Sequence, residues 1–251
     1  MSEQLVYGLH AVRAVLERRP RAARRLLLQR GRDDRRAQEL AELAARARVE
    51  TASCPAAELD ALTGGAVHQG AVLAVEALPP LEEHELLKGL DAGTLPLLLV
   101  LDGVQDPHNL GACLRAADGA GVDAVIVPRD RAAGLTAAVR KVAAGAAETV
   151  PLVQVTNLAR LLRALKEQGI WIVGADGAAE TVHHAADLTL PLALVLGAEG
   201  AGMRRLTRAH CDVLVKLPML GAVESLNVAV AAGILLYEAR RQRTQSPKHL
   251  K

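Results

Sequence analysis

The sequence predicts an α/β protein built from a helix-covered parallel sheet and a smaller α/β unit that precedes it. From residue 97 onward, short and almost continuously apolar runs alternate with amphipathic segments of helical period. Strands that are apolar on both faces are typical of parallel sheets buried between helices. Strand-like and helical segments also alternate before residue 78, and a chain of 251 residues has room for two small domains.

The N-terminal unit is expected to contain three helices and three strands. Helical periodicity covers residues 8–18, 33–48 and 55–62. The strand-like runs cover residues 25–29, 49–53 and 70–76. Pro55 stands at the beginning of the third helix, where helices tolerate a proline. Together these segments describe a small α/β domain.

A change of composition separates the two parts of the chain. Residues 79–96 contain prolines, an acidic run (EEHE) and glycines at positions 89 and 93. Such a composition is typical of a linker between domains, here with room for one short helix. We therefore expect an N-terminal domain over residues 1–77, a linker over residues 78–96 and a second domain over residues 97–251.

The second domain is expected to contain six strands that alternate with helices. The strand-like runs cover residues 97–101, 124–127, 150–155, 170–174, 192–196 and 213–217. A helix over residues 228–243 then closes the domain, and residues 244–251 are expected to form a loose tail.

The charge of the chain is unevenly distributed along it. Residues 1–50 contain twelve Lys/Arg against seven Asp/Glu, whereas the remaining residues contain eighteen against twenty-one. The positive excess favours contact with a polyanion, although a solvated helix face gives the same pattern. Only Tyr7, Trp171 and Tyr237 are aromatic, which disfavours modules that bind single strands by stacking bases on aromatic side chains.

Other classes of protein are disfavoured by what the sequence lacks. The longest apolar runs fall well short of the roughly 20 residues that cross a membrane, and the N-terminus has no signal-peptide pattern. We therefore expect a cytoplasmic protein. Cys54, Cys113 and Cys211 are odd in number and scattered, which favours buried free thiols over disulfides or a metal site.

Three segments share one design, in which an apolar run ends in a turn that contains glycine and polar residues. They are Leu97–Ala120 (LLLVLDGVQDPHNLGACLRAADGA), Leu192–Met203 (LALVLGAEGAGM) and Val215–Ala231 (VKLPMLGAVESLNVAVA). Open α/β sheets bind their ligands at the carboxyl ends of such strands. No GxGxxG follows the first strand of the second domain, so a dinucleotide site of the Rossmann type is not expected.

The spacing of residues within these segments resembles the three signature motifs of the SpoU/TrmH family of RNA ribose 2'-O-methyltransferases. The matching stretches are Asn109–Arg115, Gly197–Gly202 and Leu217–Asn227. The resemblance is specific because three separate motifs occur in the family's order, whereas one glycine turn alone would be weak support.

The resemblance implies a fold, a cofactor and partners that composition and periodicity do not show. It implies a C-terminal methyltransferase domain with a deep trefoil knot (SPOUT type), a homodimer and S-adenosyl-L-methionine as methyl donor. The opening YGLHAVRAVLE and the HQG at His68–Gly70 resemble the ribosomal-protein-like N-terminal domain of the branch that methylates guanosine in 23S rRNA. That domain is implied to bind RNA. Its phosphate contacts would come from Arg18, Arg19, Arg21, Arg24 and Arg25.

The same resemblance assigns the residues of the site. The catalytic positions of the family match Asn109, Arg115, Glu199, Ser225 and Asn227. The positions that contact the cofactor match Gly197, Leu217 and Leu226. The glycine also has a purely conformational explanation, because a turn requires it whether or not a ligand binds.

Arg115 carries the main chemical question of the site. An arginine keeps its proton up to about pH 12, so a role as a base requires an unusual environment. We expect Arg115 to bind the phosphate beside the target ribose or to stabilise the developing alkoxide, with the proton lost to phosphate or water. The structural alternative is a surface ion pair with Asp118.

The polar residues of the other motifs also have structural alternatives. Asn109 could begin a helix, in competition with Asp106, and Ser225 and Asn227 could cap the last helix. Glu199 stands between two glycines, where a carboxylate is an unusual choice for a simple turn. It could orient Arg115 or the nucleotide.

A possible metal cluster is the remaining candidate site. His183, His184 and Asp187 lie close together in the sequence, but no further ligand motif accompanies them, which favours an exposed loop. We expect no metal, since methyl transfer to a ribose hydroxyl does not need one.

The leading hypothesis is methylation of a guanosine ribose in 23S rRNA by a cytoplasmic homodimer. A tRNA ribose 2'-O-methyltransferase is the first alternative, disfavoured because tRNA-specific members more often lack the N-terminal domain. A non-catalytic RNA-binding or ribosome-assembly protein of the same fold is the second, disfavoured because a pure binder does not need the five polar motif residues. A nicotinamide-dependent dehydrogenase is disfavoured by the missing glycine fingerprint.

Overall fold

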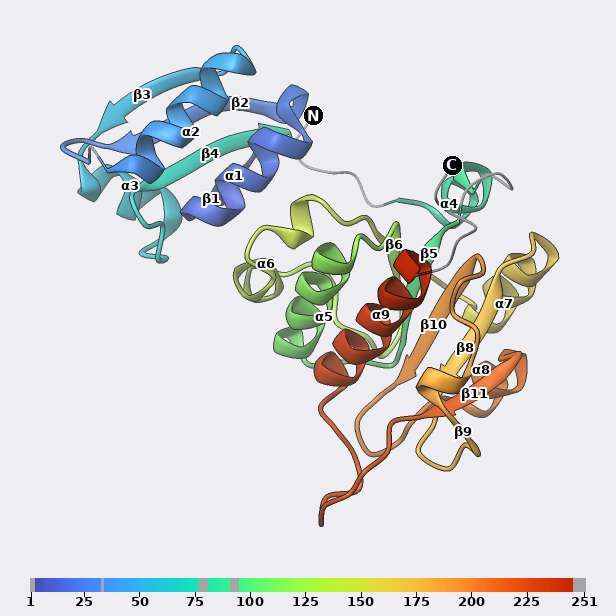
Figure 1. Ribbon diagram of the computed structural model, residues 1–251. Helices are drawn as coiled ribbons and strands as arrows, with labels where there is room; N and C mark the ends of the chain where they lie inside the picture. Colours follow the sequence, from blue (N-terminus) through green and yellow to red (C-terminus); the bar gives the residue numbers. More distant parts are fainter. Residues whose placement is uncertain (1–2, 33, 77–80, 91–94, 246–251) are drawn as a thin grey trace. The chain divides into compact units, whose positions relative to one another are not determined.

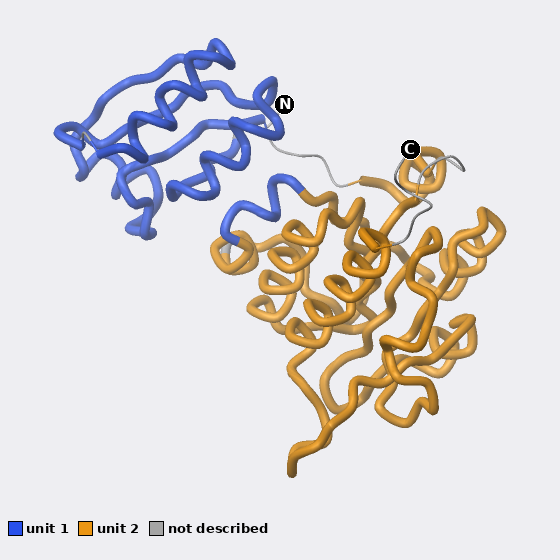
Figure 2. The backbone as a smooth tube through the Cα atoms, viewed as in Figure 1, with its two compact units in different colours: residues 1–79, 144–149 blue, residues 80–143, 150–251 orange. Residues whose placement is uncertain are grey.

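The computed structural model describes residues 3–32, 34–76, 81–90 and 95–245. The chain divides into two compact units (Figure 2), one of residues 1–79 with 144–149 and one of residues 80–143 with 150–251. Within the described ranges, no helix has both the length and the apolar character of a membrane span.

The first unit contains a four-stranded sheet with the order β1-β4-β2-β3. Its strands are β1 (Glu3–Tyr7), β2 (Ala23–Gln29), β3 (Glu50–Cys54) and β4 (Ala71–Glu76). β4 is antiparallel to both β1 and β2, and β2 is parallel to β3. The three predicted strands are confirmed to within two residues at each end, whereas β1 was missed because its five residues include Glu3 and Gln4.

The predicted helices of the first unit are confirmed as α1 (Leu9–Arg18), α2 (Arg35–Arg46) and α3 (Ala56–Thr63), and a short 3-10 helix, η1 (Pro20–Ala22), follows α1. α2 begins after Asp34, whose carboxylate accepts hydrogen bonds from two backbone N–H groups of its first turn. Apolar residues of α1 and α2 share one core with those of β1, β2 and β4.

The two N-terminal stretches that resemble the family meet in the structure. The Gln69 side chain accepts a hydrogen bond from Leu9 N at the start of α1. His68 is buried, with Nε2 3.0 Å from Asp60 Oδ1 and Nδ1 accepting from Gly70 N. Both ring nitrogens are therefore used to hold the turn before β4, so His68 is a packing residue.

The second unit is built on a seven-stranded sheet with the order β7-β6-β5-β10-β8-β11-β9, parallel throughout its pairings. The predicted strands are confirmed as β5 (Leu97–Asp102), β6 (Ala124–Pro128), β7 (Leu152–Val155), β8 (Trp171–Ala175), β10 (Leu192–Gly197) and β11 (Val213–Lys216). β9 (Thr181–Val182) was missed because two residues carry no periodicity.

Helices cover both faces of this sheet (Figure 1). They are α4 (Glu83–Gly89), α5 (Pro107–Ala120), α6 (Ala137–Ala143), α7 (Leu158–Glu167), α8 (Arg205–His210) and α9 (Val228–Gln245). Two further 3-10 helices are η2 (Ala146–Glu148), which belongs to the first unit, and η3 (His183–Ala185). α5 lies beside both α6 and α9, whereas α4 and α7 share a core with the other face of β5, β6 and β7. α9 is the predicted closing helix; it includes Thr244 and Gln245 of the expected tail, whose remaining residues lie outside the described part.

Part of the expected linker is an ordered piece of the second unit. Leu81 pairs with Val153 of the edge strand β7. α4 begins with a capping box made by Glu82 and Glu85, and it buries Leu86 in the core. The sequence allowed for one short helix here, but the contacts of this helix with the sheet were not predicted.

The end of α9 is fastened to the beginnings of two strands. Arg243 is buried, and its guanidinium donates hydrogen bonds to four backbone carbonyls, those of Leu95, Pro96, Leu188 and Leu190. These carbonyls stand just before β5 and β10. Burial lowers the pKa of Arg243, with a further contribution from the charge of Arg240.

The trefoil knot stays a prediction, since strand order and pairing describe neighbours and not threading.

Candidate active site

The site lies at the carboxyl ends of β5 and β10, which are neighbours near the middle of the sheet. Gly197, the last residue of β10, is opposite Asp102, the last residue of β5. Beyond Gly197 the chain turns back sharply, because Ala198 and Gly202 exchange two backbone hydrogen bonds of 3.2 and 2.8 Å. A side chain at Gly197 would overlap the backbone of Gly202 and Met203, so this turn requires glycine there.

A buried carboxylate holds the end of this turn. Asp102 is 1% exposed, and its Oδ2 accepts a 2.8 Å hydrogen bond from the backbone N–H of Arg204. Arg204 Nε lies 3.3 Å from Asp102 Oδ1 and compensates the charge. This pair was not predicted from the sequence. The sequence does show a carboxylate directly after an apolar strand, which could have marked Asp102 as important. Its partner could not be predicted, because Arg204 stands 102 positions further along the chain.

Three of the predicted catalytic residues meet above this turn. Glu199 Oε1 accepts hydrogen bonds from Asn109 Nδ2 (3.2 Å), Asn227 Nδ2 (2.9 Å) and the backbone N–H of Val228 (3.3 Å). Asn227 Nδ2 also donates to Asn109 Oδ1 at 2.8 Å. One residue from each sequence motif therefore contributes to a single network, in which neutral donors surround a carboxylate.

The helix caps account for how these side chains reach each other. Asp106, followed by a proline, begins α5 and accepts a 2.9 Å bond from His108 N, so Asn109 is not the cap and its amide can reach Glu199. Asn227 performs both roles considered for it. Its Oδ1 accepts from Ala229 N (2.9 Å) at the start of α9, while its Nδ2 joins the network.

A cavity of about 370 Å³ opens on one side of Glu199. The three predicted cofactor positions, Gly197, Leu217 and Leu226, all line it. The remaining lining residues are Ala175, Asp176, Gly177, Leu196, Ala198, Glu199, Gly200, Gly202, Val215, Met219, Glu224, Ser225, Val228 and Ala231. Apolar side chains and glycine backbone dominate this lining, as in pockets for small organic ligands.

A second cavity of about 330 Å³ opens on the other side of the network. Its lining comes from the loop after β5, from Asn109 on α5 and from the turn after β10. The two cavities share Ala198, Glu199 and Val228. Glu199 thus lies in the wall between two adjacent cavities, in the position from which it can contact ligands in both.

Arg115 and Ser225 do not join the network. Arg115 is exposed on α5, and among the described residues it has no hydrogen-bond or ion-pair partner. Arg115 lies six positions after Asn109, so the two side chains leave the helix about 120° apart. Ser225 is exposed and lines the first cavity without a hydrogen bond to another described residue.

Charge in and near the first cavity is tuned by its neighbours. The hydrogen bond from Arg208 to Asp176 (2.6 Å) holds the pKa of that carboxyl below its usual value. Burial raises the pKa of Cys113 to about 12, and the charge of Glu199 contributes to this rise. Burial likewise raises the pKa of Cys211 to about 12. Neither thiol is a thiolate near neutral pH. All three cysteines are free; Cys54 and Cys113 are buried, as predicted, whereas Cys211 is only partly buried.

The structure also describes the region proposed as a possible metal cluster. The rings of His183 and His184 pack edge to face, 5.1 Å apart, and Asp187 accepts bonds from the backbone and hydroxyl of Thr189. Within the described part of the chain, no group of three or more His, Cys, Asp or Glu residues is arranged to hold a metal ion.

Two family models match the chain. The model of the SpoU rRNA methylase family matches residues 96–237, which contain all eight predicted site residues. The chain belongs to the SpoU rRNA methylase family. A second model, described as the RNA 2'-O ribose methyltransferase substrate-binding domain, matches residues 5–81.

Relatives of this SpoU methylase match it over nearly its whole length. The 23S rRNA (guanosine-2'-O-)-methyltransferase RlmB of Pectobacterium atrosepticum is 57% identical over 97% of this chain and 99% of its own. The RlmB of Escherichia coli K12 is 52% identical over 97% of this chain and 100% of its own.

Solved structures confirm the fold. The SpoU methyltransferase AviRb from Streptomyces viridochromogenes, crystallised with AdoMet, is 27% identical and superposes with a TM-score of 0.75, covering 97% of this chain and 92% of its own. A TrmH/SpoU tRNA-modifying enzyme from A. aeolicus is 31% identical, has a TM-score of 0.56 and covers 65% of this chain and 83% of its own.

Proposed function

We propose that this SpoU methylase transfers a methyl group from S-adenosyl-L-methionine to the ribose 2'-hydroxyl of a guanosine in 23S rRNA. The observation that carries the proposal is the position of Glu199, bonded by Asn109 and Asn227 in the wall between two cavities. A transfer reaction needs this layout, because donor and acceptor must meet at one point from separate binding sites. The names of the full-length relatives support the substrate.

The first cavity fits the proposed cofactor. Leu217 and Leu226 offer apolar contact, and Gly197 lets backbone groups come close to a ligand. The carboxylates of Asp176, Glu199 and Glu224 line the same cavity and suit a positively charged sulfonium. S-adenosylmethionine, when bound, supplies an electrophilic methyl group. We assign Gly197, Leu217 and Leu226 to its binding.

The second cavity is the proposed place of the acceptor ribose. Three donors fix Glu199 Oε1, whereas its Oε2 has no hydrogen-bond partner among the described residues. Oε2 is therefore available to accept a hydrogen bond from the 2'-hydroxyl and to orient it for in-line attack. We assign Ser225, at the edge of the first cavity, to the same polar environment. The proton of the hydroxyl passes to phosphate or water.

Two surfaces of this unit are proposed to contact partners: Arg115 on α5 and the exposed side of α9. The guanidinium of Arg115 is exposed and unpartnered in the described chain, which suits a contact with RNA phosphate. On α9, which packs beside α5, Val230, Ile234 and Tyr237 form an apolar stripe and are 51, 39 and 56% exposed. We propose that a second copy of the chain covers this stripe. Sedimentation analysis of wild type and Ile234→Glu tests the homodimer.

Residues 1–77 are proposed to be the RNA-binding domain and residues 97–251 the methyltransferase domain, joined by residues 78–96, of which α4 packs on the second sheet. The arginines of the RNA-binding domain are not equally available. Arg21 is exposed, whereas Arg24 and Arg25 form ion pairs with Glu76 and Glu50. Arg19 donates to the backbone carbonyl of Glu76, so its role in RNA binding is the weakest of the five.

The test is transfer of a labelled methyl group to unmodified 23S rRNA, mapped by the alkali resistance of the phosphodiester that follows a 2'-O-methyl. One resistant guanosine is expected. Labelling of tRNA instead would favour the tRNA enzyme, and no labelling together with no heat of cofactor binding would favour a non-catalytic binder. The rRNA substrate implies that the protein works in the cytoplasm.

A further inference from the structure

The loop after β6, residues 129–134, lies against the loop that lines the second cavity. Ala133 N donates a 2.9 Å hydrogen bond to Val104 O, and Val104 is one of the lining residues. A Cβ at Gly103, which also lines this cavity, would be 3.9 Å from the carbonyl oxygen of Arg131 and 3.9 Å from Arg204 Nη2. The backbone of Arg131 and the guanidinium of Arg204 therefore both lie beside Gly103, at one edge of the proposed acceptor cavity.

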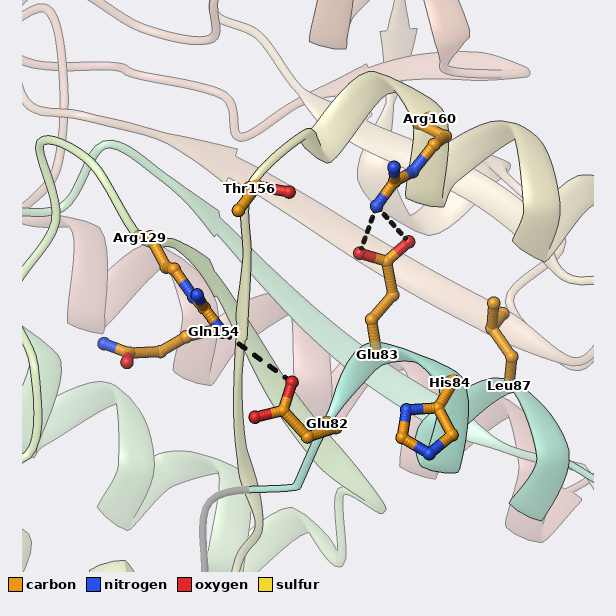
Figure 3. A pocket seen from close by; sticks show the side chains of 8 residues that line it. All are labelled: Glu82, Glu83, His84, Leu87, Arg129, Gln154, Thr156 and Arg160. Carbon is orange, nitrogen blue, oxygen red and sulfur yellow. Dashed lines mark hydrogen bonds and ion pairs between the residues drawn. The ribbon is translucent and has the colours of Figure 1, made fainter.

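The arginines around this edge differ in whether their charge is already compensated. Arg204 lies against buried Asp102 at 3.3 Å. Arg129 forms an ion pair with Glu82 (Figure 3), in which Nη2 and Oε2 are 3.7 Å apart. The exposed Arg131 has no hydrogen-bond or ion-pair partner within the described part of the chain. Its charge is thus the one left available for a ligand at this edge.

The backbone of Arg131 supports a functional interpretation. Its φ is +57°, in the left-handed region that glycine and asparagine adopt readily and arginine does not. Non-glycine residues kept in such a conformation cluster at active sites and ligand-binding loops. The loop therefore holds an uncompensated guanidinium in a conformation that does not favour it.

We propose that Arg131 binds a phosphate of the RNA strand next to the target nucleotide. This inference rests on the proposed function and extends it to a residue outside the three motifs. The ligand is a phosphodiester rather than the cofactor's carboxylate, because the Arg131 loop contacts Gly103 and Val104 of the second cavity, whereas none of its residues lines the first. Negative charge of Asp106 and Glu199 in the cavity would repel an RNA backbone, and the guanidinium offsets that repulsion.

The test compares Arg131→Gly, Arg131→Lys and the matched control Arg163→Ala. Glycine removes the charge and favours the left-handed backbone, so the loop keeps its shape, while lysine retains the charge. Arg163 is an exposed arginine of α7 in the same unit. For each full-length protein, KM for unmodified 23S rRNA, the salt dependence of RNA binding, and the affinity for S-adenosylmethionine are measured.

Arg131→Gly is expected to raise KM for RNA about tenfold and to reduce the slope of log affinity against log salt by about 0.7–0.9. Cofactor affinity should stay unchanged, Arg131→Lys should recover most of the loss, and Arg163→Ala should match wild type. The inference would be overturned if Arg131→Gly and Arg163→Ala had the same KM for RNA and the same salt slope. It would also be overturned if Arg131→Gly weakened cofactor binding as much as RNA binding. Failure of the proposed function itself is distinct, since the wild type would then not methylate 23S rRNA.

Discussion

Two regions at the carboxyl edge of the sheet differ in whether their charged side chains are paired. The cavity in Figure 3, about 320 Å³ at the carboxyl ends of β6 and β7, pairs its charges internally: Arg160 Nη2 donates to both oxygens of Glu83 at 2.9 and 3.0 Å. In the wall between the two central cavities, neutral amides surround Glu199 and leave its charge uncompensated. Paired charges fasten α4 to α7, whereas an unpaired charge held by neutral groups remains available to a ligand.

The strongest test of this comparison is Glu199→Gln. The amide oxygen can still accept the three hydrogen bonds that Oε1 accepts now, so the network survives while the charge and the second acceptor oxygen are lost. We expect methyl transfer to slow by about 100-fold or more. Single-turnover rates on 23S rRNA measure this, with Glu83→Gln as the matched control.

Unchanged turnover in Glu199→Gln would contradict the assignment of the carboxylate. Cofactor affinity, measured by calorimetry, shows whether a loss of rate reflects chemistry or binding of the methyl donor.

The second test separates the two roles of Asn227. In Asn227→Ser the hydroxyl can still cap α9, but both donor bonds to Glu199 and Asn109 are lost. We expect a rate loss of about tenfold with little change in Tm, whereas Asn227→Ala should also lose about 1 kcal/mol of stability. Equal rates in wild type and Asn227→Ser would show that only the cap matters.

Breaking the ion pair in the cavity of Figure 3 should change the stability of the protein but not its activity. Arg160→Ala breaks the bond to Glu83, but the arginine side chain is 59% exposed, so solvent weakens the pair. We expect a loss of about 0.5 kcal/mol or less in the free energy of unfolding and unchanged methyl transfer. Denaturant titration and the methylation assay check the two halves. A large loss of activity would mean that this cavity also serves the reaction.

The last expected effect is the pH response of the Asp176–Arg208 pair, which also concerns stability alone. Because Arg208 lowers the pKa of Asp176, the pair contributes stability that is complete above the carboxyl's ordinary pKa and is lost as pH falls through the lowered value. Solvent screening of the half-exposed Arg208 keeps this below about 1 kcal/mol. Unfolding curves of wild type and Arg208→Ala should therefore differ above about pH 4 and converge in stronger acid. A constant difference down to pH 2 would contradict the pairing.

Sequence predicted the strands of the sheet because apolar runs such as Leu97–Asp102 are local signals. It also named the residues of the Glu199 network, but only through resemblance to a family. The bonds themselves join positions 90 and 118 residues apart, and periodicity carries no information about such pairs. The Asp102–Arg204 pair was missed for the same reason.

Loops and surfaces were predicted least well. The left-handed conformation of Arg131 has no signature in the sequence, since glycine or asparagine would normally mark it. The docking of α4 on β7 was hidden by the acidic and proline-rich composition around it. Arg115 is the opposite case. The motif predicts that it is important, but the structure gives it no partner among the described residues.

The hydrogen bonds of Arg243 set an order of events during synthesis. The carbonyls before β5 and β10 receive these donors only after the end of α9 has left the ribosome. The packing of α9 on the second unit is therefore completed only after almost all of the chain has been translated, whereas the N-terminal sheet has all four of its strands by residue 76. A nascent chain of this protein would thus present a folded N-terminal sheet while its catalytic half is still being made.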